Sequence, residues 1–147
     1  MKLDLKGRSF IFKEEGVKLK AYLCAAGVPT IGVGCTYYPD GRKVKLGDTI
    51  TLQECNELFD DVVENFEAIV NREIKVPISQ NQFNALVSFA FNIGIEGFRK
   101  STLLKMINAK AGKDAISEQF ARWNKAGGKV NAGLVGRRKR ETLLYFS

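Results

Sequence analysis

The sequence predicts a mostly helical α+β chain, with a small mixed lobe, a long helix and a helical C-terminal lobe. Three observations predict this fold class. Segment 19–50 has short apolar runs divided by glycine and proline, which is typical of strands and turns. Segment 51–70 carries apolar residues at intervals of three and four, the period of a helix. From residue 79 onward, further amphipathic segments are separated by glycine-containing turns, as in a helical lobe.

The composition is that of one globular domain, which we expect to cover residues 1–147. Hydrophobic residues make up 45% of the chain and charged residues 27%, close to the average for globular proteins. The first eight residues are polar and charged, and no apolar run approaches the ~20 residues that a membrane span needs. We therefore expect no signal peptide and no transmembrane segment, synthesis in the cytoplasm, and a monomer.

The charge of the chain is spread unevenly. The formal net charge is +7, and segment 99–140 holds twelve Lys and Arg residues against two acids, whereas segment 51–70 holds six acids and no base. A basic lobe suggests a polyanionic partner, which could be nucleic acid, an anionic lipid or an anionic wall polymer. The alternative is a solvated basic surface without a partner.

Two residue counts exclude whole classes of site. The chain has no histidine, so Ser-His-Asp and Cys-His hydrolases lack their base and zinc amidases lack their commonest ligand. The three cysteines, Cys24, Cys35 and Cys55, form no CxxC pair. We therefore expect no metal centre, no disulfide framework and no cofactor.

The N-terminal helix is expected to end at Gly16. Leu5 and the run 10–12 are loosely helical, and Lys13-Glu14-Glu15-Gly16 is typical of a helix end with glycine at the C-terminal cap. Glu15 would then lie on the last turn, where the negative end of the helix dipole and partial burial favour its protonated form. The alternative is a solvated glutamate at a helix end.

A small mixed lobe is expected at about residues 14–50. Residues 21–23, 30–33 and 43–45 are candidate strands of a three-stranded sheet. Pro39-Asp40-Gly41 is expected to form a turn between two of them, because proline presets φ and glycine accepts a positive one.

A long connecting helix is expected at about residues 51–72, and a helical lobe at about residues 73–147. Thr51 and Glu54 form a capping box, and Cys55 falls on the apolar stripe, where it would fill the core. Ser79 and Gln82 form a second capping box, which starts a helix that ends at Gly94 and Gly97. Further helices are expected at 102–108, 114–123 and 134–145.

The motifs of the chain carry a family resemblance. Glu15 is followed after eight residues by Cys24 and, after five more, by Thr30 and the run Ile31-Gly32-Val33-Gly34. The later motifs are Gln80–Phe89, Asn92-Ile93-Gly94, Ser101–Leu104, Trp123, and Gly133–Arg138 with Glu141. Together they resemble the phage-type lysozymes, the endolysins of glycoside hydrolase family 24, whose signature is E-x8-D/C-x5-T. The resemblance covers nearly the whole chain in the family's order.

The resemblance implies a lysozyme-like two-lobe fold and a muramidase that hydrolyses the β-1,4 bond between N-acetylmuramic acid and N-acetylglucosamine, lysing the bacterial host wall. Peptidoglycan is the implied partner, nucleic acid is not, and release from the cytoplasm to the periplasm would depend on a holin. Two alternatives remain. The first is a lytic transglycosylase, which needs a single glutamate and would leave 1,6-anhydro-muramic products. The second is a basic binder of wall polymer or nucleic acid, which would have no activity.

Hydrolysis of a glycosidic bond needs a proton donor and a group that stabilises the oxocarbenium-like transition state, usually two carboxylates. The resemblance implies that Glu15 is the general acid and that Thr30 holds the attacking water. Cys24 stands where many relatives have aspartate, and a nearby Glu15 carboxylate is expected to raise the pKa of its thiol above the ordinary ~8.5.

Four possibilities stay open for Cys24 and its effect on the reaction. It could act as a nucleophile and give retention, or orient water with Thr30. The fold could have lost hydrolysis. On spacing alone, Cys24 could also be a small buried core residue.

Other positions match the family with a less definite role. Phe91, Asn92 and Ser101 match positions that the resemblance places along the substrate cleft. Cys35 stands where the family often has a histidine that braces the glutamate. Trp123 is expected to pin the C-terminal core, and two of the four basic residues 137–140 are expected to support Glu141 or neighbouring loops.

Overall fold

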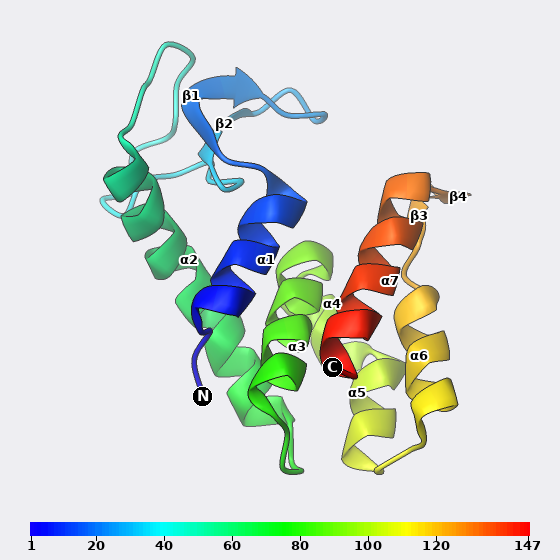
Figure 1. Ribbon diagram of the computed structural model, residues 1–147. Helices are drawn as coiled ribbons and strands as arrows, with labels where there is room; N and C mark the ends of the chain where they lie inside the picture. Colours follow the sequence, from blue (N-terminus) through cyan, green and yellow to red (C-terminus); the bar gives the residue numbers. More distant parts are fainter. The chain divides into compact units, whose positions relative to one another are not determined.

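The computed structural model describes residues 1–147 and divides them into two compact units (Figure 1). Unit 1 comprises Met1–Arg8 and Phe66–Ser147, and unit 2 comprises Ser9–Asn65. The boundaries between them fall inside α1 (Leu5–Glu15) and α2 (Leu52–Glu73). Seven helices and two short antiparallel sheets confirm the prediction of a mostly helical α+β chain. None of the helices has the length and apolar content of a membrane span.

Helix α1 ends as its sequence predicts. Gly16 has a φ of +77° and its N–H donates to the Phe12 carbonyl at 2.9 Å, which closes the last turn. A side chain at that φ would be strained, so glycine at this cap lets the chain leave the helix and enter β1 (Lys18–Leu23) within two residues.

The sheet of unit 2 has two strands. β1 pairs in antiparallel fashion with β2 (Pro29–Gly32), with Tyr22 opposite Thr30 and Leu23 opposite Pro29. The prediction of a third strand at 43–45 is wrong, because Lys43 forms only an isolated bridge with Tyr37. The Pro39-Asp40-Gly41 turn is confirmed, with the Tyr38 N–H donating to the Arg42 carbonyl at 2.9 Å.

The physical reason for the missing strand lies in the side chain of Asp48. Its Oδ2 accepts from the Tyr38 hydroxyl at 2.6 Å and from the Lys45 N–H at 3.0 Å. These bonds fold segment 37–48 onto itself. The Val44 N–H still donates to the Thr36 carbonyl at 3.0 Å, but pairing between these segments stops at the isolated Tyr37–Lys43 bridge.

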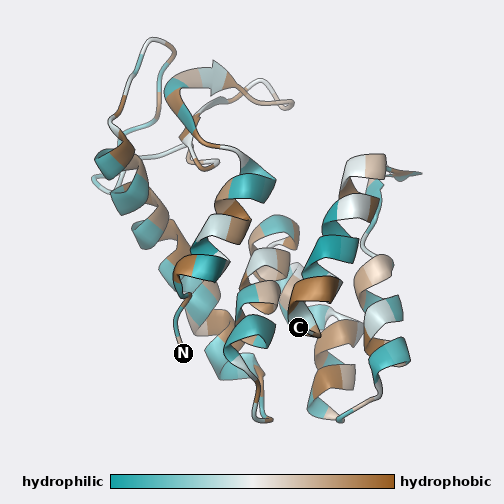
Figure 2. Cartoon of the chain, viewed as in Figure 1, coloured by the Kyte–Doolittle hydropathy of each residue, from teal (hydrophilic) through white to brown (hydrophobic).

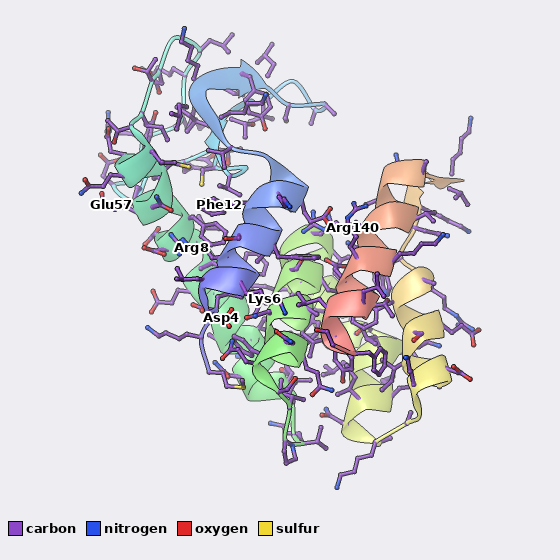
Figure 3. All side chains as sticks on the ribbon, in the orientation of Figure 1. Asp4, Lys6, Arg8, Phe12, Glu57 and Arg140 are labelled. Carbon is purple, nitrogen blue, oxygen red and sulfur yellow. The ribbon has the colours of Figure 1, made fainter.

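The core of unit 2 joins the sheet region to the first half of α2. Ile31, Cys35, Val44 and Leu58 form a buried cluster. Phe12, labelled in Figure 3, packs edge-to-face on Phe59 with ring centroids 4.9 Å apart. Cys55 is fully buried, which confirms its prediction as a core residue.

Helix α2 begins with the predicted capping box. The Thr51 N–H donates to Glu54 Oε1 at 3.0 Å, and the Glu54 N–H donates to Thr51 Oγ1 at 3.1 Å. Hydrophobic and hydrophilic residues alternate along its turns (Figure 2), as an amphipathic helix requires. Its 22 residues confirm the prediction of a long helix in this part of the chain.

Unit 1 is built around α3 (Gln80–Ile93), whose residues 83–90 are all buried. The predicted capping box of Ser79 and Gln82 is present. Gly94, at a φ of +93°, ends the helix as expected, but Gly97 lies within the next helix rather than at the end of α3. The remaining elements are α4 (Ile95–Lys100), α5 (Thr102–Asn108), α6 (Lys113–Ala121), the hairpin of β3 (Lys125–Ala126) and β4 (Lys129–Val130), and α7 (Ala132–Tyr145). Helix α7 packs on both α3 and α6.

The start of the chain is tied to α3 through Asp4, labelled at the beginning of α1 in Figure 3. Its Oδ1 accepts from the Gly7 N–H at 2.9 Å and from Asn84 Nδ2 at 2.8 Å. A Cβ on Gly7 would lie 2.4 Å from the Asn84 side chain. Glycine is therefore required at position 7, because the backbone of α1 and the Asn84 side chain approach each other closely.

Candidate active site

Cys24 lies in the turn that joins β1 to β2. Its N–H donates to the Val28 carbonyl at 3.0 Å, and its carbonyl accepts from the Gly27 N–H at 2.8 Å. Gly27 has a φ of +75°, which a tight turn of this kind needs. The turn brings the half-buried thiol of Cys24 into hydrogen-bonding contact with Thr30 on β2.

The turn also sets the acidity of the thiol. Hydrogen bonds from the backbone N–H groups of Val28 and Ala26, and the contact with Thr30, lower the pKa of Cys24 against the opposing effect of desolvation. The expectation that Glu15 raises the pKa of this thiol is wrong, because N–H donors at hydrogen-bonding distance dominate. The sequence contained one hint of this, the glycine-containing turn after Cys24, since tight turns direct backbone N–H groups inward.

Thr30 is 3% exposed, and its hydroxyl donates to the Val28 carbonyl at 2.9 Å. A hydroxyl has a single proton to donate. The contact with Thr30 lowers the pKa of Cys24 because the hydroxyl can donate to the thiolate. If the thiol ionises, the hydroxyl can turn from the carbonyl to the sulfur, so the orientation of Thr30 is coupled to the charge of Cys24.

Glu15 is the last residue of α1 and is half-buried. The alternative for this position was a glutamate fully surrounded by solvent, and the partial burial of Glu15 does not agree with it. All three candidate catalytic residues belong to unit 2, and the structure brings Cys24 and Thr30 together. The role of Glu15 as the acid stays a prediction.

The other two thiols differ from Cys24 in their surroundings. Cys35 is 4% exposed and Cys55 is fully buried, and burial raises the pKa of the Cys35 thiol. The backbone of Cys35 exchanges two hydrogen bonds with Ile31, at 2.8 and 2.9 Å. Cys24 is therefore the thiol that is open to a reaction, and it is not the small core residue that spacing alone allowed.

The three residues predicted to contact substrate belong to unit 1. Phe91 is half-buried against Phe66, with ring centroids 5.1 Å apart. Asn92 is exposed, and its Oδ1 accepts from Arg138 Nη2 at 2.5 Å. Ser101 is buried, donates to the Phe98 carbonyl at 2.7 Å and caps α5 by accepting from the Leu104 N–H at 3.2 Å. This favours a structural role for Ser101 over substrate binding.

Glu141 forms the centre of a buried ion cluster between α3 and α7. It has no exposed surface, and its carboxylate lies 2.7 Å from Arg138 Nε and 3.2 Å from Arg137 Nε. The Ser88 hydroxyl of α3 donates to it at 2.6 Å. Burial raises the pKa of Glu141, and the two guanidinium groups oppose that rise. The prediction that two of the basic residues 137–140 support Glu141 is confirmed.

Arg138 connects this cluster to Trp123 and Asn92. Its Nη1 donates to the Trp123 carbonyl at 3.3 Å, and the Trp123 ring packs edge-to-face on Phe89 at 5.8 Å. Trp123 is half-buried and its ring packs on the buried Phe89, which agrees with the expected role at the C-terminal core. The contact between Arg138 and Asn92 spans 46 residues of sequence, and no local pattern could have indicated it.

Known proteins are similar to this chain in sequence and in fold. The endolysin of Salmonella phage P22 is 40% identical over 147 residues, covering 100% of this chain and 99% of that protein. The endolysin of Bacillus phage PZA is also 40% identical, over 148 residues, and the chain spans 56% of its length. Among solved structures, the endolysin from Escherichia coli O157:H7 phage FAHEc1 matches with a TM-score of 0.93 at 41% identity, covering 100% of this chain and 94% of that one.

The similarity in sequence and fold to phage endolysins over the whole chain defines a lysozyme-type glycoside hydrolase. Residues 12–141 match the family model described as phage lysozyme. The chain belongs to the phage lysozyme family. The predictions of family, fold class and enzyme class are confirmed.

Proposed function

We propose that the chain hydrolyses the β-1,4 bond between N-acetylmuramic acid and N-acetylglucosamine, with Glu15 as the general acid. Membership of the phage lysozyme family makes it a peptidoglycan-degrading enzyme. The observation that carries the finer proposal is the contact between Cys24 and Thr30 in the unit that also holds Glu15. The three residues keep the spacing of the family signature.

Glu15 supplies the proton for the leaving oxygen. It is half-buried at the C-terminal end of α1, where the helix dipole is negative. A general acid must carry its proton when the substrate binds.

Cys24 replaces the second carboxylate. Because its hydrogen bonds lower the pKa of the thiol, the thiolate is more populated near neutral pH than for an ordinary cysteine. The thiolate can take a proton from the attacking water, which gives inversion, or attack the anomeric carbon, which gives retention. Thr30 orients the sulfur through its hydroxyl in either case.

The role of Glu15 is tested by Glu15→Gln. We expect the variant to lose lysis of purified peptidoglycan, because glutamine has no proton of suitable acidity, and to keep its circular dichroism spectrum. Glu14→Gln, one residue earlier in the same helix, is the matched control and should lyse at the wild-type rate. Wild-type lysis by Glu15→Gln would remove Glu15 from the mechanism.

The role of Cys24 is tested by Cys24→Asp, Cys24→Ser and Cys24→Ala with mass spectrometry of the products. Aspartate restores the residue common in the family and should keep activity, whereas serine and alanine should lose it. A reducing end identifies a hydrolase, and a 1,6-anhydro ring would identify a lytic transglycosylase. Cleavage by Cys24→Ala at the wild-type rate would show that the thiol has no part in the reaction, and the absence of any product from the wild type would leave only a binding function.

We also propose that the protein is a monomer, is made in the host cytoplasm and depends on a holin for its release to the wall. Family membership supports an enzyme that acts on the wall after release. Sedimentation equilibrium tests the monomer. Induction in cells with and without a holin tests release, and lysis without the holin would contradict it.

A further inference from the structure

A groove of 440 Å³ lies between α6 and α7 in unit 1. The two helices pack side by side (Figure 1). Ala121 on α6 and Val135 and Leu143 on α7 are among the residues that line it. Leu143 is 72% exposed, so a large apolar side chain stands at the groove with most of its surface in water.

Two of the polar residues that line the groove, Thr142 and Arg138, direct their polar atoms elsewhere. The Thr142 hydroxyl donates to the Arg138 carbonyl of its own helix at 2.7 Å. The Arg138 guanidinium is held by Glu141 and Asn92, so only its aliphatic stem is available to the groove. The surface offered to a ligand is therefore mainly hydrocarbon.

The rim of this groove is basic. Lys139 lines it, and the β3–β4 hairpin, which directly follows the lining residue Asn124, carries the exposed Lys125 and Lys129. No carboxylate lines the groove. Glu118 of α6 is already paired with Arg122 at 3.2 Å. The hairpin adds a second exposed apolar side chain, Val130, at 65% exposure.

An apolar groove with a cationic rim limits the occupants that fit it. A second copy of the chain would bring like charges together, which costs free energy. A hydrophilic polyanion would satisfy the lysines but would leave the apolar surface in water. The surface of an anionic bilayer presents phosphates and hydrocarbon in adjacent layers, so it matches both.

We propose that the α6–α7 groove and the β3–β4 hairpin dock the protein on membranes that contain anionic phospholipid. The three lysines contact lipid phosphates, while Leu143 and Val130 enter the boundary between headgroups and acyl chains. This contact is separate from the hydrolytic reaction and does not depend on it.

Vesicle binding tests the proposal. The full chain is mixed with vesicles of phosphatidylcholine alone, or of phosphatidylcholine with phosphatidylglycerol, and binding is measured by co-sedimentation and by the emission of the single tryptophan, Trp123. We expect binding only where phosphatidylglycerol is present, and weaker binding at high salt because the lysine–phosphate attraction is screened. Equal binding to both vesicles, or to neither, would overturn the proposal.

Matched variants locate the docking surface. Leu143→Gln should weaken vesicle binding about tenfold through lost apolar contact, and Lys125→Glu and Lys139→Glu should weaken it by at least about fivefold each. Leu46→Gln, Lys43→Glu and Lys45→Glu change exposed residues of unit 2 and should bind as the wild type does. All six variants should lyse purified peptidoglycan at the wild-type rate, which separates docking from catalysis.

Three results would contradict the docking surface. Equal losses in the controls would indicate a general charge effect. Loss in the lysine variants with full binding by Leu143→Gln would indicate recognition of a polyanion instead of a lipid surface. Self-association in sedimentation equilibrium that Leu143→Gln abolishes would assign the groove to a second copy of the chain.

Discussion

Replacing Glu141 with glutamine removes a negative charge that lies between two buried arginines. Arg137 and Arg138 are 5% and 1% exposed, and both lie within 3.2 Å of the Glu141 carboxylate. Glutamine keeps the shape of the side chain and its bond to Ser88 but not the charge. Two buried guanidinium groups would then lose the counter-charge that Glu141 supplies.

The expected loss of stability follows from this burial. Removing one partner of a buried ion pair typically costs about 3–5 kcal/mol, because the remaining charge is desolvated and uncompensated. For a chain of this size each kcal/mol lowers the melting temperature by about 2–4 °C, so the expected decrease is about 6–20 °C. Full activity at low temperature should remain if the fold is kept.

Urea unfolding, monitored by Trp123 fluorescence, measures this loss of stability. The reporter is well placed, because the Trp123 carbonyl accepts from Arg138. Glu118→Gln is the matched control: it breaks an exposed pair with Arg122, in which the side chains are 66% and 64% exposed, and should cost about 0–1 kcal/mol. A loss for Glu141→Gln no larger than that for Glu118→Gln would refute the idea that the buried cluster stabilises unit 1.

Three further predictions concern single residues. Because its pKa is lowered, Cys24 should react with iodoacetamide at neutral pH faster than the buried Cys35, and equal rates would contradict the hydrogen-bonded thiolate. Gly7→Ala should lower stability by about 1–3 kcal/mol, since a Cβ would meet Asn84 at 2.4 Å, and an unchanged urea midpoint would show that the contact relaxes freely. Ser79→Ala should cost about 1 kcal/mol by removing the cap of α3, measured in the same unfolding experiment.

The helix ends show how much of the fold could be predicted from the sequence. Thr51 with Glu54, Ser79 with Gln82, and Gly16 all act within four residues of the chain, so their type and spacing were enough to predict where helices begin and end. Strand pairing has no such local rule. Residues 43–45 had the composition of a strand, yet they form only an isolated bridge, and the Lys45 N–H donates to the Asp48 side chain.

For the candidate site as well, some features could be predicted from the sequence and others could not. The spacing of Glu15, Cys24 and Thr30 could be read from the sequence and led to the family. The direction of the Cys24 pKa shift could not, because it depends on where the N–H groups of Ala26 and Val28 point once the turn has closed. The charge of Glu15 is visible in the sequence, whereas the direction of these donors is not.

The sequence by itself determined the class of fold, the family and the identity of the three candidate catalytic residues, because periodicity, caps and motif spacing are local properties of the chain. Only the tertiary structure decided that Cys24 is held in a form that ionises readily, that Ser101 serves as a helix cap, and that Glu141 is buried between two arginines. These outcomes depend on hydrogen-bond directions and burial. Both arise when residues distant in sequence pack together.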